Sequence, residues 1–227
     1  MSTVLLPFVA TLVLLGVVAV VVVALLQAAK RRDELAAFAQ SRGWTYARSD
    51  RRWVTHFRGA PFGRGHARNA ENVLTGLHEG RQMVAFDYRY DETTGTGENR
   101  STTTYRYSVV ALSLGADLPA LSVSPEGFFG RLVGRITGSD IELESEDFNR
   151  AFTVTCPDRK FAFDVLHQRT MEFLLQHRQT AWRFERGMLL MAERGTHSPD
   201  QVLARLGFMT ALLGHVPEFV WREAHGR

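Results

Sequence analysis

Cysteine is nearly absent from this chain, since Cys156 is the single one among 227 residues. A lone cysteine cannot form an internal disulfide, which fits a reducing compartment, and it excludes any multi-cysteine metal site. The eight histidines are scattered, with no pair at the i, i+4 spacing that places two imidazoles on one helix face. The sequence therefore predicts no metal centre.

Positive charge is missing from the start of the chain, because no lysine or arginine precedes Lys30. Residues 4–26 are 23 consecutive uncharged residues, and a helix of that length crosses roughly 30 Å of hydrocarbon. A secretory signal instead has a cationic start and an apolar stretch of about 7 to 15 residues. Residues 1–29 are therefore predicted to be a retained transmembrane anchor. Cleavage near Ala24, Ala28 or Ala29 is the alternative.

Cations follow the apolar run directly, at Lys30, Arg31 and Arg32. Lysine and arginine close to a spanning helix mark its cytoplasmic end. We therefore expect a single-pass protein of the inner (cell) membrane, with its N-terminus outside and its C-terminal domain in the cytoplasm.

The positive charge is concentrated beside the anchor. Residues 30–68 carry a net charge of +7, whereas the rest of the chain is about 4 units negative. Each cation close to an anionic leaflet contributes on the order of 1 kcal/mol to membrane binding. Residues 30–68 are therefore interpreted as a basic juxtamembrane segment that faces the lipid bilayer and its anionic headgroups. The candidate anion or headgroup contacts are Arg31, Arg32, Arg51, Arg52, Arg64, His66 and Arg68.

Within this segment, DELAAFAQSRG places Leu35, Phe38 and Ala39 on one face of a helix that ends at Gly43. Such an amphipathic helix either packs on the folded domain or lies on the membrane surface. The sequence leaves both possibilities open.

Patterns of period two predict an antiparallel sheet in a domain over residues 69–227, with a start near residue 44 as the alternative boundary. One hairpin is expected over 72–77 and 82–90, with its turn at Glu79-Gly80. A polar, flexible hairpin tip over 91–103 then leads into a strand that ends at residue 114. Further strands are expected at 140–144 and 151–156, and a second hairpin turns at Arg186-Gly187.

Helix signals lie between and after these strands. Ser124-Pro125-Glu126 predicts a short helix that carries Phe128, Phe129, Leu132 and Val133. Asp158 is predicted to cap a helix that runs to about His177. Ser198, Pro199 and Gln201 form a capping box, followed by a buried stripe of Val202, Leu206, Met209 and Leu213. The elements together predict an α+β fold behind an N-terminal transmembrane helix, with a mainly antiparallel sheet and a few packing helices.

No convergent catalytic set is recognisable. The loop with Gly63 and Gly65 lacks the Gly-Lys-Ser/Thr of a P-loop and the third glycine of a dinucleotide fingerprint. No serine lies in a Gly-x-Ser-x-Gly setting, and Cys156 before Pro157 is expected to be a buried, inert thiol. We therefore assign no catalytic residues and no cofactor. Nucleic acid is not an expected partner, because the basic excess adjoins the membrane span instead of forming a stripe on the domain.

The segment DIELESEDFNRAFTVTCPDRKFAFDVLHQRTMEFLL resembles a bacterial membrane-associated domain family of unknown function. The shared features fall on Glu144-Ser145, on Phe148, Phe152 and Val154, and on Met171, Leu174 and Leu175. The N-terminal half is similar to anchored proteins common in actinobacteria. The resemblance implies a shared fold and transfers no chemistry. Independently of it, Phe148 and Phe152 are i, i+4 and are expected to bury together.

The sequence thus indicates a cytoplasmic domain that binds a membrane protein partner or the leaflet without catalysis of its own. The alternative is a membrane-bound enzyme acting on a phosphorylated or lipid substrate. In that hypothesis Arg64, His66 and Arg68 act together with an acid from Asp140, Glu142 or Glu144.

Overall fold

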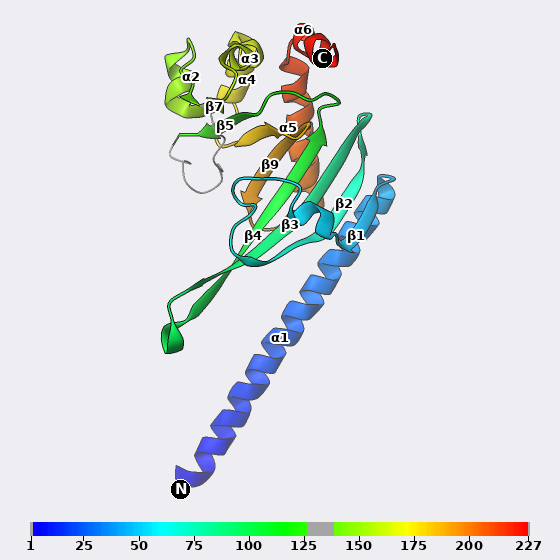
Figure 1. The fold of residues 1–227 in the computed structure, drawn as a ribbon. Coiled ribbons are helices and arrows are strands. Elements are labelled where there is room, and N and C mark those ends of the chain that lie inside the picture. The colour runs from blue at the N-terminus through cyan, green and yellow to red at the C-terminus, as the bar shows by residue number, and fades with distance from the viewer. Residues whose placement is uncertain (1, 127–138, 227) are drawn as a thin grey trace.

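The computed structural model describes residues 2–126 and 139–226 as one long helix joined to a folded domain (Figure 1). Helix α1 (Ser2–Ser41) runs without interruption from the N-terminus to the domain. Its residues Leu14–Ser41 are long and apolar enough to cross a membrane, and the leucines and valines between Leu14 and Leu26 are exposed. The predicted order, an apolar N-terminal helix followed by an α+β domain, is confirmed.

The domain is built on a nine-stranded sheet in the order β1-β2-β3-β4-β9-β8-β5-β7-β6. Every pairing in it is antiparallel. The strands are β1 (Thr45–Ser49), β2 (His66–His78), β3 (Arg81–Thr94), β4 (Ser101–Ser113), β5 (Leu121–Pro125), β6 (Ser139–Asp140), β7 (Phe152–Cys156), β8 (Trp182–Glu185) and β9 (Met188–Arg194).

The two predicted tight hairpins are present. Glu79 and Gly80 both have positive φ values, of 49° and 78°, as do Arg186 and Gly187, of 52° and 68°. Two successive residues of positive φ form the type I′ turn whose twist matches that of the flanking strands.

The predicted hairpin tip over 91–103 is mostly strand. The β3–β4 ladder continues to the pair Thr94↔Ser101, so that only residues 95–100 connect the strands, with a short 3-10 turn η2 (Gly97–Asn99). Threonines hold this ribbon together through cross-strand contacts such as Thr93 Oγ1 to Thr102 Oγ1 at 3.0 Å. The ribbon projects from the sheet toward the same end of the molecule as the N-terminal half of α1 (Figure 1).

The helices of the domain are η1 (Arg51–Val54), α2 (Glu146–Ala151), α3 (Arg159–Val165), α4 (Gln168–Leu175), α5 (Pro199–His215) and α6 (Glu218–His225). The capping box of α5 is confirmed, since the Ser198 hydroxyl accepts from the Gln201 N–H and the Gln201 side chain accepts from the Ser198 N–H. The predicted apolar stripe of α5 is buried.

The prediction of a single helix from Asp158 to about His177 is wrong in one respect. The structure has two helices here, α3 and α4, because the chain leaves helical geometry at Leu166. This residue leaves helical geometry, with φ −96° and ψ 45°, and is buried in the core. His167 then begins α4 in a new direction, with its Nε2 2.9 Å from the carbonyl oxygen of His215 at the end of α5. The apolar spacing continues across the break because α3 and α4 both pack on the same core.

The segment around Ser124 and Pro125 also differs from its prediction. Both residues lie in β5, where Ser124 pairs with Thr153 and Pro125 with Phe152 of β7. The helix predicted to carry Phe128, Phe129, Leu132 and Val133 falls outside the described residues. The strand predicted over 140–144 is confined to β6, although Ile141 and Leu143 are buried while Glu142 and Glu144 are exposed, as alternation requires.

The burial of the Phe148–Phe152 pair is confirmed, with the ring centroids 4.9 Å apart at the junction of α2 and β7. Cys156 is a buried thiol whose pKa is raised by desolvation, which agrees with an inert role.

Side chains alternate between two cores on the two faces of the sheet. Met83 and Ala85 of β3 join the core that α5 covers, whereas Val84 and Phe86 join the core beneath the 57–62 loop. The last turns of α1 belong to the first core, because Leu35 and Ala39 are buried there beside Trp44. The amphipathic end of the anchor helix therefore packs on the domain.

Gly76 of β2 makes room for Trp44 at this junction. A Cβ added at Gly76 would lie only 2.2 Å from Cδ1 of the Trp44 ring, which is buried and donates a hydrogen bond of 2.8 Å to the Leu77 carbonyl. The ring cannot withdraw without breaking that bond.

We expect Gly76→Ala to destabilise the domain by about 1 to 3 kcal/mol, because the added methyl overpacks the Trp44 site. Thermal unfolding of the full chain in detergent, followed by circular dichroism, measures the effect. Gly207→Ala is the matched control, since this exposed glycine of α5 has open space around it and is expected to gain roughly 0.5 to 1 kcal/mol. Equal effects at the two positions would contradict the packing argument.

Candidate membrane-proximal cleft

One face of the sheet changes from apolar to charged toward the end where the anchor helix arrives. Along β3 this face presents Met83 and Ala85, then Asp87 and Arg89. In β4 the register places Leu112 and Val110 opposite Met83 and Ala85, and Ser108 and Arg106 opposite Asp87 and Arg89. The apolar part is covered by α5 and the end of α1, whereas the charged part borders an open cleft.

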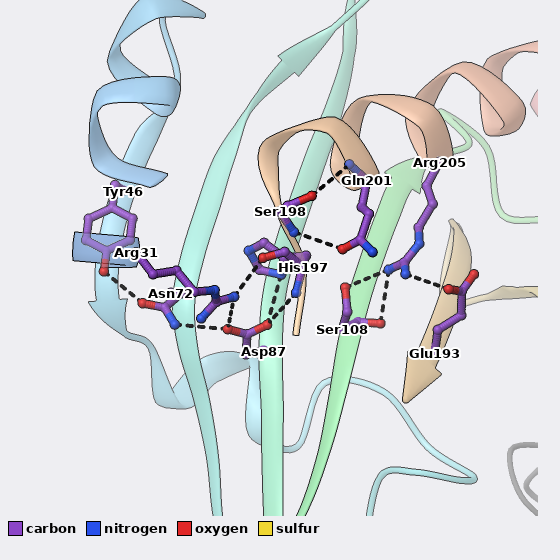
Figure 2. Close-up of polar contacts among 10 residues, drawn as sticks. All are labelled: Arg31, Tyr46, Asn72, Asp87, Ser108, Glu193, His197, Ser198, Gln201 and Arg205. Atoms are coloured by element: carbon purple, nitrogen blue, oxygen red, sulfur yellow. Dashed lines mark hydrogen bonds and ion pairs between the residues drawn. The ribbon is translucent and has the colours of Figure 1, made fainter. Parts of the chain in front are cut away.

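Asp87 is the centre of a buried polar cluster that joins three parts of the chain (Figure 2). Its Oδ2 accepts from Arg31 of α1 at 2.7 Å and from Asn72 of β2 at 2.9 Å. Its Oδ1 accepts from the backbone N–H of His197 at 3.1 Å and lies 3.1 Å from Nδ1 of that imidazole. The remaining Arg31 contact is a 2.8 Å hydrogen bond to the His197 carbonyl oxygen.

The electrostatics of this cluster favour an ionised carboxylate. Burial alone would raise the pKa of Asp87, but the contacts with His197, Arg31 and Asn72 outweigh it and hold this pKa below its usual value. Tyr46 of β1 extends the cluster by donating to the Asn72 side-chain oxygen at 2.9 Å. The ion pair between Arg31 and Asp87 thereby attaches α1 to the middle of strand β3.

A second polar contact lies beside the first, one strand further along the sheet (Figure 2). Arg205 of α5 donates to the Ser108 hydroxyl at 2.6 Å and to Glu193 of β9 at 2.6 Å. The Arg31–Asp87 and Arg205–Glu193 pairs lie at the edge of the apolar core where the sheet face becomes charged.

Beyond this polar layer is a cleft of about 940 Å³ between α1 and strands β1 to β4. Its volume is within the range of roughly 300 to 1,000 Å³ that is usual for ligand sites. Five arginines line it against the two carboxylates Asp87 and Glu71. The lining residues are Ala24, Gln27, Ala28, Arg31, Arg32, Arg48, Ser49, Asn69, Glu71, Asn72, Asp87, Arg89, Arg106 and Thr196.

The seven arginine and histidine positions predicted to meet headgroups do not form one site. Arg31 and Arg32 line the cleft, but the Arg31 guanidinium is engaged with Asp87. Arg51 and Arg52 lie exposed in η1, where Arg52 pairs with Asp50 at 2.7 Å. Arg64, His66 and Arg68 are exposed where the chain enters β2, and they are not among the cleft residues.

The structure does not bring together the groups of the alternative enzyme hypothesis. Arg64, His66 and Arg68 lie at or beside β2, the second strand of the sheet, whereas Asp140 is in β6, the ninth. Seven strand spacings of about 4.8 Å separate these positions by roughly 30 Å. Glu142 and Glu144 follow β6 directly and are equally remote, so the pairing required for catalysis is not formed.

Sequence reasoning missed Asp87, His197, Arg89 and Arg106 as members of the site. For the residues in strands, the signal is a charged side chain on the face that packs in the core: in MVAFDYRY, Asp87 and Arg89 point to the same face as Met83 and Ala85. In TYRYSVVAL, Arg106 and Ser108 have the same parity as Val110 and Leu112. A charge on a core face indicates a buried partner or a functional opening.

Comparison with known proteins bears on the fold. No family model matches the chain, and no curated protein sequence matches it. A crystal structure of the mycobacterial trehalose monomycolate transport factor A, TtfA, superposes with a TM-score of 0.57. The fold is similar to that of TtfA. The match covers 82% of this chain and 96% of TtfA at 15% sequence identity, so it shows a shared fold with a protein of an actinobacterium and no more.

We expect Asp87→Asn to lower the free energy of unfolding by roughly 3 kcal/mol, because it leaves the partly buried Arg31 without its counter-charge. Urea unfolding of the full chain in non-ionic detergent, followed by tryptophan fluorescence, measures the loss. Glu34→Gln is the control, since it removes a carboxylate from α1 whose pair with Lys30 is long, at 3.9 Å, and exposed. If both variants unfold like the wild type, the Arg31–Asp87 pair does not attach the helix to the domain.

Proposed function

We propose that this chain is a non-catalytic accessory factor of lipid transport, anchored in the inner membrane with its domain on the cytoplasmic side. The observation that supports it most directly is the cationic cleft beside the final turns of the apolar helix, between Ala24 and Arg32. A site at that position meets lipid headgroups, or a membrane protein partner, as soon as the helix is inserted.

Two further observations agree with this proposal. The fold resembles that of TtfA, which is described as a trehalose monomycolate transport factor. The two carboxylates of the cleft also have partners within the chain, which agrees with a non-catalytic role: Asp87 contacts Arg31 and His197, and Glu71 accepts a 3.0 Å hydrogen bond from Asn69.

The proposed orientation predicts that the domain is shielded from the outside of the cell. A cysteine introduced on α6, Glu218→Cys, which is exposed and lies at the end of the molecule opposite the N-terminus of α1 (Figure 1), is expected to react with a membrane-impermeant maleimide only after spheroplasts are lysed. The wild-type chain is the control for background labelling, because its single cysteine, Cys156, is buried and should stay unlabelled in the folded protein. Labelling in intact spheroplasts would place the domain outside and exclude the proposed topology.

The proposed role predicts a change in where a lipid is found without a change in its chemistry. Depletion of the chain in its native cells should leave an envelope lipid at the inner membrane and reduce it in outer layers, as measured by fractionation and lipid mass spectrometry. Wild-type protein should restore the distribution, and a version that lacks residues 1–29 should not. Accumulation of a chemically unprocessed precursor would instead identify the chain as an enzyme.

A further inference from the structure

The cleft contains an arrangement of charge that the fold itself does not require. Arg89 of β3 and Arg106 of β4 are direct cross-strand partners, and like charges placed opposite each other destabilise a sheet. Arg48 of β1 and Arg32 of α1 line the same cleft. In the described part of the chain, none of these four guanidiniums forms an ion pair.

Arg89 supplies an independent indication. Its Nε is shielded from solvent and has no hydrogen-bond acceptor among the described residues. A donor left in this state is unusual in folded proteins, and an oxyanion that draws the guanidinium toward itself would satisfy it. Arginine is also the side chain best suited to grip phosphate or carboxylate in a forked geometry.

The position of the cleft indicates where such an oxyanion comes from. Arg32 is six residues beyond Leu26, the last residue of the apolar run, which is about 9 Å along a helix axis. The polar headgroup layer of a bilayer is roughly 5 to 8 Å deep on each side. The arginine cluster therefore lies at, or just above, the level of the lipid phosphates.

The wall that α1 contributes to the cleft carries small side chains. Ala24 and Ala28 present small apolar side chains there, with Gln27 between them. Small side chains on this wall leave room for a headgroup to move from the plane of the leaflet toward the arginines.

We propose that the cleft binds the anionic headgroup of a single lipid from the adjoining leaflet, with its phosphate or carboxylate held among Arg32, Arg48, Arg89 and Arg106. This inference rests on the membrane anchoring proposed above and adds the ligand class of the site. Arg31 does not contact the headgroup, because it is committed to Asp87, and it acts as a positioning residue for the helix wall.

The test uses the full chain in non-ionic detergent with equal amounts of phosphatidylglycerol and phosphatidylcholine, and native mass spectrometry to count retained lipids. The wild type is expected to retain one phosphatidylglycerol in preference to phosphatidylcholine. Arg48→Gln combined with Arg106→Gln is expected to lose that preference about tenfold, since each arginine contributes charge-assisted hydrogen bonds. Both arginines are exposed, so the fold should tolerate the change.

The matched control removes the same charge elsewhere. Arg51→Gln combined with Arg68→Gln changes two exposed arginines outside the cleft and should retain the lipid as the wild type does. Equal loss in both double variants would show attraction by diffuse charge only and overturn the proposal. Thermal unfolding shows whether each variant is folded. If the Arg48→Gln, Arg106→Gln double variant does not fold, the single variant Arg106→Gln is tested in its place.

Two further outcomes would also overturn the proposal. Millimolar inorganic phosphate that displaces the lipid completely would identify a free-anion site, and a co-purifying acidic polypeptide that excludes the lipid would identify a protein-docking site. The lipid-distribution experiment is independent of this one. A chain that redistributes lipid in cells but retains none here keeps its proposed function and loses only this ligand.

Discussion

The ion pair between Arg31 and Asp87 is the interaction on which the rest of this structure depends. It joins the apolar N-terminal helix to the middle of strand β3, and His197 and Asn72 complete the hydrogen bonding of the carboxylate. Replacing such a buried pair by apolar residues often costs little stability, whereas removing one partner alone leaves an uncompensated buried charge. Because α1 is continuous, no flexible linker separates the sheet from the apolar part of the helix, and the orientation of the domain follows from that of the helix.

Alternate residues of β3 point to the same face of the sheet, and along this face their side chains change from apolar to charged. Met83 and Ala85 pack in the core, Asp87 is buried at its edge with its carboxylate hydrogen-bonded, and Arg89 lines the cleft. Stability and binding are thus separated along the same strand. The like-charged pair Arg89↔Arg106 is tolerated because the neighbouring apolar rows of β3 and β4 hold the register.

Features governed by short-range rules could be predicted from the sequence, and features governed by distant partners could not. Ser198 and Gln201 specify the start of α5 through mutual hydrogen bonds, and Arg186-Gly187 specifies a turn by backbone conformation alone. Asp87 and His197 are 110 residues apart, so nothing local to either one reveals the contact. Pro125 was predicted to open a helix and instead ends a strand, because pairing with Phe152 of β7 outweighs the local capping signal.

The attachment of the domain to a lipid-embedded helix also determines what binding would cost. A soluble carrier must withdraw acyl chains from the membrane, at about 0.8 kcal/mol for each CH₂ exposed to water. A cleft that opens beside Ala24 and Ala28 requires only lateral movement of a headgroup, because the chains remain in the bilayer. In the binding mode proposed above, the four guanidiniums would select a headgroup by its charge. Such a site suits a factor that selects or presents a lipid and leaves its transfer to another protein.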